Sequence, residues 1–276
     1  MQRLLYGILL LCLTACKGDY ATKEEPRLVI EGWIDKDGFP MVFLTRSIPV
    51  PEEYQDVSDL KQYVERWAKV TISDGQHEEV MTGRMDKNYM PPYYYTTSSM
   101  RGVAGRTYHI HVECTDDLTA DASATIPDYS VAIDSFWVAP VEGNDTLFQL
   151  NARLDDKVCN APYYKVFAQV DRLLGNPASS MYGLFSCDML ENNRIVINRG
   201  YSNLWKYQIH FSINETVYLK IAAISEEQYQ FWRMYDNMQS LSRNPLFPVT
   251  DNIPSNVSSG IGYWFGYASV NYVVSI

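Results

Sequence analysis

Few side chains in this sequence have the types and spacing that chemistry requires, and the histidines come first. His109, His111 and Glu113 alternate along a predicted strand, which places all three on the same face. Imidazole and carboxylate groups at this spacing could form part of a metal site. A polar strand face in contact with solvent explains the same pattern without a metal, and we favour this interpretation.

The acidic residues do not point to a reaction either. The DKDG segment at residues 35–38 has three residues of a calcium loop but lacks the downstream glutamate, which favours a hairpin turn. Asp155 and Asp156 are adjacent, with no sign of the second carboxylate that a glycosidase requires. The sequence contains no G-x-S-x-G, H-E-x-x-H or P-loop motif. We therefore expect no enzyme, no metal and no cofactor; the alternative is a hydrolase whose residues come from distant positions.

An apolar segment near the start of the chain, residues 4–15, is followed directly by a cysteine. It is too short for a membrane-spanning helix, which needs about 20 apolar residues. Arg3 before it and the small residues at its end are typical of a secretory signal peptide, which we place at residues 1–15. The sequence LTAC, ending at Cys16, resembles a bacterial lipobox, which implies cleavage before Cys16 and acylation of that residue. The alternative is an ordinary signal peptide that happens to contain a cysteine.

The segment after this cysteine and the overall charge bear on how the protein is held at a membrane. Residues 16–26 are polar and lack apolar periodicity, so we expect a tether. The formal net charge of −10 excludes the basic surface that nucleic-acid-binding proteins need. The same charge disfavours adhesion to anionic headgroups, so acyl chains on Cys16 would hold the protein to the lipid bilayer.

The remaining cysteines predict one buried thiol and one candidate disulfide. Cys114 shares a predicted strand face with Tyr108 and Ile110, so we expect its thiol to be buried. Cys159 and Cys187 are free to pair in an oxidising compartment. The alternative is that both stay unpaired.

Apolar and polar residues alternate with a period of two along most of the sequence, which predicts an all-β fold. Residues 27–127 contain about seven short strands separated by turn residues, the pattern of an immunoglobulin-like β-sandwich. Pro127 and Asp128 mark the boundary after it. Residues 129–276 predict a second β-sandwich domain, which contains one helix.

The predicted helix lies near residues 226–241. Ser225 and Gln228 have the spacing of a capping box at its start, and the prolines that follow prevent its continuation. Tyr229 and Trp232 lie outside the centre of its apolar stripe, so each either packs beneath a neighbouring loop or anchors a partner. The stripe consists of Phe231, Met234, Tyr235, Met238 and Leu241.

The sequence is rich in tyrosine, with 21 residues of this type. Tyrosine suits half-buried strand positions and also contact surfaces. Tyr93, Tyr94 and Tyr95 follow two prolines in an extended segment and cannot all point inward, so we expect at least one to be exposed in a binding loop. This segment and the helix are the two candidate surfaces for a ligand or partner.

A family resemblance is carried by nine segments that span nearly the whole chain after the signal peptide. They are LVIEGWI, VFLTRS, AKVTISDG, MRGVAGRTYHIHV, ASATIP, IDS, YLKIAAISEEQYQFW, NPLFP and SNVSSGIGYWFGY. In this ordered set the sequence resembles the domain-of-unknown-function 4249 family. These are lipoproteins of the Bacteroidota that are often encoded beside TonB-dependent outer-membrane transporters. The resemblance implies an outer-membrane lipoprotein that is accessory to nutrient import, and it implies no catalytic residues.

Two further expectations depend on this resemblance. Surface lipoproteins of the phylum carry an acidic cluster after the lipid cysteine, whereas only Asp19 lies near Cys16 here. We nevertheless expect the cell surface rather than the periplasmic face. The DTL sequence at residues 145–147 resembles the short O-glycosylation sequence of the phylum, with Thr146 as its acceptor.

These observations lead to one expected function and one alternative. We expect a lipid-anchored accessory or binding protein of the outer membrane that helps a TonB-dependent transporter to capture or hand over a ligand. The ligand would be a small molecule, a peptide, a glycan or a chelate. The alternative is a scaffold lipoprotein whose partners are only proteins.

Overall fold

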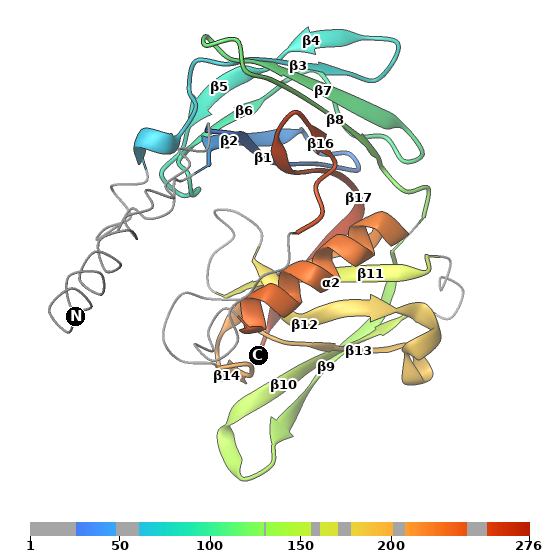
Figure 1. Cartoon of the computed structure of the whole chain (residues 1–276). Helices are drawn as coiled ribbons and strands as arrows, with labels where there is room; N and C mark the ends of the chain where they lie inside the picture. Colours follow the sequence, from blue (N-terminus) through green and yellow to red (C-terminus); the bar gives the residue numbers. More distant parts are fainter. Residues whose placement is uncertain are drawn as a thin grey trace, which may run out of the picture.

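The structure is a computed structural model that describes residues 26–47, 61–129, 131–155, 161–170, 178–200, 208–241 and 253–276. It confirms the predicted all-β, sandwich-like fold with one long helix (Figure 1). None of the helices in these ranges combines the length and the apolar character that a membrane span requires.

Eight strands come from the described part of the first half of the chain. They are β1 (Leu28–Asp35), β2 (Met41–Arg46), β3 (Lys69–Ser73), β4 (Glu78–Val80), β5 (Thr82–Met85), β6 (Tyr93–Thr96), β7 (Thr107–Glu113) and β8 (Thr119–Thr125). The strands of the second half are β9 (Ile133–Val141), β10 (Asn144–Leu154), β11 (Tyr163–Val170), β12 (Ser179–Ser186), β13 (Arg194–Ile197), β14 (Phe211–Ser212), β15 (Thr216–Ile224), β16 (Val257–Ser258) and β17 (Ile261–Ser275). Its helices are the short 3-10 turns η2 (Cys187–Met189) and η3 (Glu191–Asn193), and α2 (Glu226–Leu241).

An eight-stranded sheet forms the centre of the molecule, in the order β12-β11-β15-β17-β1-β2-β6-β5. Its middle strand, β17, has two different partners along its length. Residues 261–267 pair in parallel with β1, and residues 268–275 pair antiparallel with β15. The last strand of the chain therefore joins strands from the two halves into one sheet.

Two smaller sheets cover one face of this central sheet (Figure 1). The five-stranded sheet, β16-β8-β7-β3-β4, lies at the top of Figure 1, and β9, β10, β13 and β14 lie at the bottom. Side chains of β7 alternate between the core and the solvent. Tyr108, Ile110 and Val112 are buried between the sheets, while His109 points to solvent.

The domain division predicted from the sequence is corrected by this topology. The sequence predicts an immunoglobulin-like sandwich at residues 27–127 and a second sandwich domain at residues 129–276. Instead, β16 pairs with β8, and β17 pairs with β1, so the last segment of the chain completes the first sandwich. Trp264 of β17 is fully buried there, and its Nε1–H donates to the Tyr108 carbonyl oxygen at 3.1 Å.

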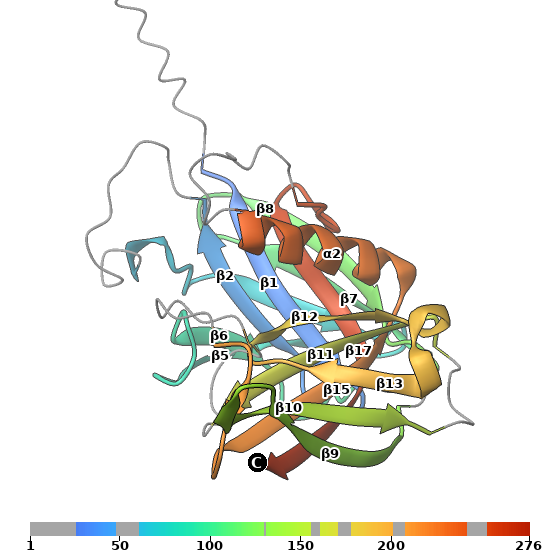
Figure 2. The same cartoon turned by 90° about the horizontal axis from the view of Figure 1, so that it is seen from below.

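Helix α2 lies on the opposite face of the central sheet, next to β11 and β12 (Figure 2). Its bounds match the predicted helix, and so does its cap. The Ser225 backbone N–H donates to Gln228 Oε1 at 3.0 Å, and the Gln228 N–H donates to Ser225 Oγ at 3.2 Å. These two backbone N–H groups at the start of the helix thus both have a hydrogen-bond acceptor.

The face of α2 that meets the sheet differs from the predicted stripe. Trp232, which we placed off the stripe, is only 4% exposed, whereas Met234 and Met238 are half-buried. Trp232 meets the Phe167 ring edge-on at 5.4 Å, and its Nε1–H donates to Tyr267 Oη at 3.2 Å. Trp232 is buried because it contacts aromatic side chains of the sheet. The spacing of apolar residues along the helix does not reveal these contacts.

Candidate functional site

Several residues singled out in the sequence lie outside the described residues or remain untested. Cys16 and Cys159 belong to the ranges that the structure does not describe. Cys187 is disulfide-bonded, while Cys114 is free and buried, as expected. The partner of Cys187 therefore lies outside the described residues, and its pairing with Cys159 stays a prediction. Thr146 is exposed near the start of β10, where its Oγ1–H donates to Asn144 Oδ1 at 2.8 Å.

The histidines of β7 are engaged in pairs on the polar face of the strand. His111 Nδ1 lies 2.7 Å from Asp121 Oδ1, and His109 Nδ1 lies 2.7 Å from Ser123 Oγ. Glu113 pairs with Lys69, whose Nζ lies 2.7 Å from Glu113 Oε2, and Glu113 Oε1 lies 3.7 Å from His111 Nε2. Among the residues that the structure describes, no three His, Cys, Asp or Glu side chains are grouped to hold a metal ion.

The tyrosine segment is part of a strand rather than a binding loop. Tyr93, Tyr94 and Tyr95 begin β6, which pairs with both β2 and β5. Tyr95 is buried, and Tyr93 and Tyr94 are half-buried. As expected, the three side chains do not all point into the core, but none of them is exposed in a loop, because all three belong to β6. Tyr94 packs against the ring of Tyr89, with ring centres 5.1 Å apart.

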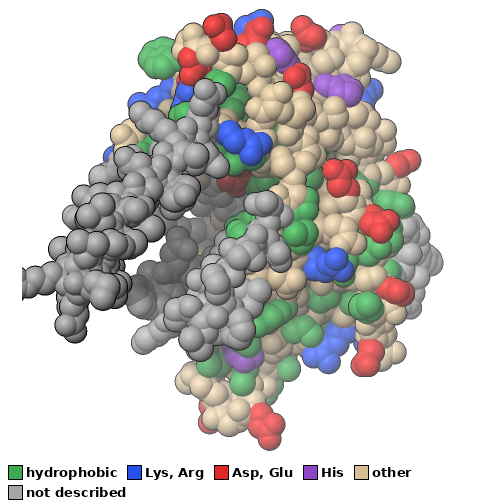
Figure 3. Space-filling model, viewed as in Figure 1, with side chains coloured by type: hydrophobic (Ala, Val, Ile, Leu, Met, Phe, Trp, Pro, Cys, Tyr) green, Lys and Arg blue, Asp and Glu red, His purple; other side chains and the backbone are tan. Residues whose placement is uncertain are grey.

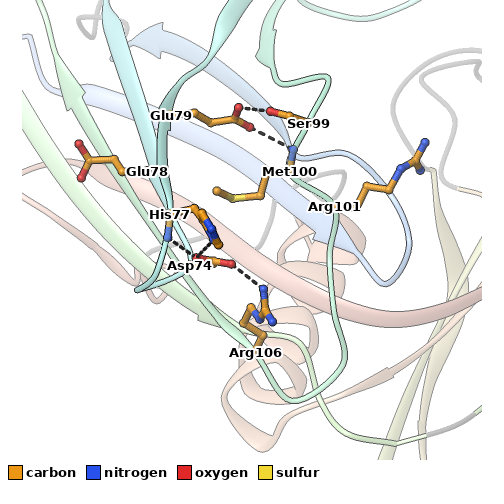
Figure 4. Close-up of a pocket in the computed structure, with 8 residues that line it drawn as sticks. All are labelled: Asp74, His77, Glu78, Glu79, Ser99, Met100, Arg101 and Arg106. Carbon is orange, nitrogen blue, oxygen red and sulfur yellow. Dashed lines mark hydrogen bonds and ion pairs between the residues drawn. The ribbon is translucent and has the colours of Figure 1, made fainter.

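One cavity, of about 430 Å³, opens at the end of the five-stranded sheet (Figure 4). Charged side chains of both signs and histidines gather at this end of the molecule, the top of Figure 3. The lining residues are Asp74, His77, Glu78, Glu79, Ser99, Met100, Arg101 and Arg106.

Two of the acids in this cavity already serve the local fold. Asp74 Oδ1 accepts the backbone N–H groups of Gln76 at 3.0 Å and His77 at 2.8 Å, and Asp74 Oδ2 pairs with Arg106 Nη1 at 2.5 Å. Glu79 Oε1 accepts the Met100 N–H at 3.1 Å (Figure 4). These carboxylates close the turn after β3 and hold the loop after β6, so we assign them a structural role.

A second cavity, of about 310 Å³, lies on the face of the central sheet that also carries α2. We call it the aromatic cleft. Its described lining residues are Trp33, Asp35, Gly38, Phe39, Met41, Tyr89, Phe167, Gln169, Tyr218, Leu219, Lys220 and Asn271. The register of the strands brings these lining residues together. Lys220 of β15 lies directly between Phe167 of β11 and Asn271 of β17. Residues from distant parts of the chain thereby form one surface.

An ion pair forms the base of the aromatic cleft. Lys220 Nζ lies 2.5 Å from Asp35 Oδ1, and the same oxygen accepts Ser269 Oγ–H at 2.7 Å. The lysine side chain is 10% exposed and the aspartate side chain 23% exposed. Burial lowers the pKa of Lys220 below its ordinary value, and the charge of Asp35 opposes this shift. The exposed fractions show that the Asp35 carboxylate is the more accessible member of the pair.

Three aromatic rings enclose the ammonium group of Lys220. Its Nζ lies 4.5 Å from the centre of the Tyr267 ring, 5.4 Å from Phe167 and 5.8 Å from Trp33. These distances are typical of cation–π contacts, which help to stabilise a desolvated charge. Within the described chain Lys220 Nζ makes no hydrogen bond of ordinary geometry, so the rings and the Asp35 charge together hold it.

A second buried lysine continues this arrangement toward α2. Lys165 Nζ lies 2.8 Å from Asp236 Oδ2 and 4.9 Å from the centre of the Trp232 ring. Ser179 Oγ–H donates to the other oxygen of Asp236 at 3.1 Å. Phe167 thus neighbours both lysines, since Lys165 lies two positions before it on β11 and Lys220 lies opposite it on β15. Each lysine is paired with one carboxylate. Lys165 has no exposed side-chain surface, so we assign this pair to the attachment of α2.

Our sequence-based reasoning missed both lysines, although each leaves a signal. In YYKVFAQV and VYLKIAAI, a lysine is the one charged residue of a largely apolar strand. A lysine in a strand that is buried on both faces requires a counter-charge, which is the sign of a buried ion pair. The partners Asp35 and Asp236 carry no comparable signal, because Asp35 is the last residue of β1, beside a turn, and Asp236 lies on a helix.

The arrangement of the aromatic cleft is suited to binding more than to a reaction. Asp35 is held by Lys220 and Ser269, so it is a fixed acceptor. Phe39, Tyr89 and Tyr218 are half-buried and present apolar ring surface around it. A fixed acceptor among aromatic walls orients a ligand, as small-molecule sites do.

Comparison with known proteins adds one finding. A family model described as "Domain of unknown function (DUF4249)" matches residues 17–272. A search of curated proteins returned no match.

Proposed function

The chain belongs to the DUF4249 family, a domain of unknown function, and from this premise we propose that it is an accessory binding protein of the outer membrane. Acylated Cys16 would anchor it in the bilayer, with the folded part at the cell surface. There it would assist a TonB-dependent transporter by capturing a ligand and handing it over.

The observation that carries the binding role is the aromatic cleft with its fixed Asp35 carboxylate. A cavity of about 310 Å³ lies within the usual range of small-molecule sites. Its polar base and half-buried rings are a costly arrangement for a protein that only needs to fold, because a buried ion pair gains little stability over apolar packing. A role of the Asp35 carboxylate in ligand contact would explain why an ion pair stands here in place of apolar packing.

The anchor is supported by the sequence and is tested separately from the cleft. Metabolic labelling with a fatty-acid analogue, followed by membrane fractionation, reports acylation and location together. Cys16→Ala should lose the label and leave the membrane fraction. Retention of the label in this variant would contradict the lipobox assignment.

The binding role is tested by thermal shift on the intact, detergent-purified protein. The panel contains peptides, glycans and metal chelates, because a ligand at 100 times its Kd stabilises the folded state by about 2.7 kcal/mol. Asn271→Ala removes an exposed amide at the cleft, and Tyr182→Ala removes a side chain that is 70% exposed on β12 and does not line it. A ligand shift that is lost only in Asn271→Ala supports the proposal. Equal shifts in both variants would contradict it.

A scaffold role is the second candidate, and one observation favours it. Trp67 is 80% exposed, and an exposed tryptophan is a frequent anchor in protein interfaces. Affinity purification from solubilised membranes should recover a TonB-dependent transporter under either role. If Trp67→Ala abolishes the recovery and no ligand shifts the protein, the scaffold role replaces the binding role. Recovery of the protein alone would count against both.

A further inference from the structure

We propose that the aromatic cleft binds an uncharged, polyhydroxylated ring, that is, a neutral saccharide. This inference rests on the proposed binding function and names the ligand class. The charge, the polar groups and the ring surfaces of the described lining residues each favour this class of ligand.

The charge of the cleft argues against ionic ligands. Asp35 and Lys220 are the two charged residues among the described lining residues, and they lie 2.5 Å apart. An anion that approached the base would meet the Asp35 carboxylate, because the ammonium group of Lys220 is covered by rings. A cation that approached Asp35 would meet the charge of Lys220 directly behind it. Both charged classes are therefore disfavoured relative to a neutral ligand.

The polar groups of the cleft match hydroxyl groups. Within the described chain both contacts of Asp35 are made through Oδ1, so Oδ2 is left to accept a hydrogen bond from a ligand. The exposed amide of Asn271, next to Lys220 in the strand register, both donates and accepts. A sugar hydroxyl also does both, so neighbouring hydroxyls can donate to Asp35 and exchange hydrogen bonds with Asn271. Hydrogen bonds to an ionised acceptor are the stronger kind.

The ring surfaces match the apolar side of a sugar. Phe39, Tyr89 and Tyr218 are half-buried around the polar base and come from three different segments. Two of the rings are held in place, because Tyr89 packs on Tyr94 and Arg101 lies 3.9 Å from the centre of the Phe39 ring. The C–H face of a pyranose packs against such a ring while its hydroxyls point to the polar groups. The volume of about 310 Å³ suits a ligand of one or two rings.

The test is isothermal titration of the detergent-purified, full-length protein with sugars matched in shape and different in charge. N-acetylglucosamine, glucosamine and glucuronate give neutral, cationic and anionic rings. Glucose, galactose, mannose, xylose and their disaccharides extend the neutral set. We expect binding of at least one neutral sugar, with at least a tenfold preference over charged rings of its size. We also expect Asn271→Ala and Tyr218→Ala each to weaken this binding at least tenfold.

The control is Tyr182→Ala, which should bind the same sugar as the unmodified protein does. Tighter binding of a charged ring than of any neutral ring would overturn the inference. So would a neutral sugar whose affinity is unchanged in Asn271→Ala and Tyr218→Ala. If a peptide or chelate binds in an Asn271-dependent manner and no neutral sugar does, the saccharide inference fails while the proposed binding function stands. Absence of binding by any of these ligands overturns both.

Discussion

The ammonium group of Lys165, on β11, lies 2.8 Å from the carboxylate of Asp236, on α2, and this ion pair attaches the helix to the central sheet. Asp236→Asn leaves the buried lysine without its counter-charge, and loss of one partner of such a pair costs about 3 kcal/mol or more. We therefore expect the free energy of unfolding to fall by about 3 kcal/mol, measured by urea denaturation followed by tryptophan fluorescence.

Two further variants make this result specific to the charge. Lys165→Met in the Asp236→Asn background removes the orphaned charge and should restore most of the stability. Arg233→Gln, an exposed change on the same helix, should stay within about 0.5 kcal/mol of the unmodified protein. Burial lowers the pKa of Lys165 from its ordinary 10.5, so Asp236→Asn should gain stability as the pH rises toward that value. A variant as stable as the unmodified protein at neutral pH would contradict the assignment.

The capping box of α2 gives a second prediction, in which two neighbouring substitutions have different costs. Ser225→Ala removes one cap bond and should cost about 1 kcal/mol. Gln228→Ala should cost about 2 kcal/mol, because the buried Gln228 amide also donates from Nε2 to the Gly266 carbonyl oxygen at 2.8 Å. Urea denaturation of both variants measures the difference. Gln230→Ala on the same turn is the control, and equal costs for the two cap residues would show that the bond to Gly266 contributes nothing.

The turn after β3 predicts a defined acid sensitivity. Backbone N–H groups of His77 and Gln76, together with Arg106, lower the pKa of Asp74 from 3.8 to about 2. The unfolded chain therefore takes up a proton before the folded protein does, so the contribution of Asp74 is complete above about pH 4 and is lost as the pH falls toward 2. In Asp74→Asn the free energy of unfolding should decline less steeply over this range. The slope should differ from that of the unmodified protein by at most about 1.4 kcal/mol per pH unit.

A companion variant separates the two sources of this sensitivity. Arg106→Gln keeps both backbone donors, so it should retain most of the acid dependence of the unmodified protein. Denaturant midpoints measured at intervals between pH 5 and pH 2 report all three slopes. If the Asp74→Asn slope equalled that of the unmodified protein, the hydrogen bonds of the turn would not be the cause.

Local sequence patterns were sufficient for the elements whose partners lie nearby in the chain. The DKDG turn forms at the predicted place, with the Gly38 N–H donating to the Asp35 carbonyl oxygen at 2.9 Å. The hairpin of β7 and β8 and the capping box of α2 follow in the same way, because each is fixed by residues a few positions apart.

The aromatic cleft could not be predicted in this way, because its groups meet only through the strand order. Asp35 and Lys220 are 185 positions apart (220 minus 35), and they flank β17, which separates their strands in the sheet. No local pattern identifies β17 as the neighbour of both β1 and β15. The same non-local pairing joins the two predicted sandwich domains through β17. It also places aromatic residues of the sheet against Trp232, which the helical spacing puts outside the centre of the apolar stripe.

The shared strand leads to the last prediction, which concerns residues 26–129 as an isolated fragment. Its core lacks Trp264, which is fully buried in the whole protein, and β8 lacks its partner β16. Loss of a buried tryptophan alone costs about 3–5 kcal/mol, a large part of the stability of a small domain. We expect this fragment to show poor amide dispersion by NMR and no cooperative unfolding.

The matched control is the same fragment joined through a flexible linker to residues 253–276. This segment supplies β16 and β17, so Trp264 can reach the Tyr108 carbonyl oxygen and β17 can pair with β1. Gly266→Ala in the joined protein sharpens the test, because a Cβ there would lie 2.7 Å from the Ile126 nitrogen and force the layers apart. Cooperative unfolding should therefore appear in the joined protein, weaken in its Gly266→Ala variant and be absent from residues 26–129. A fragment that folds cooperatively by itself would restore the division into two independent sandwiches.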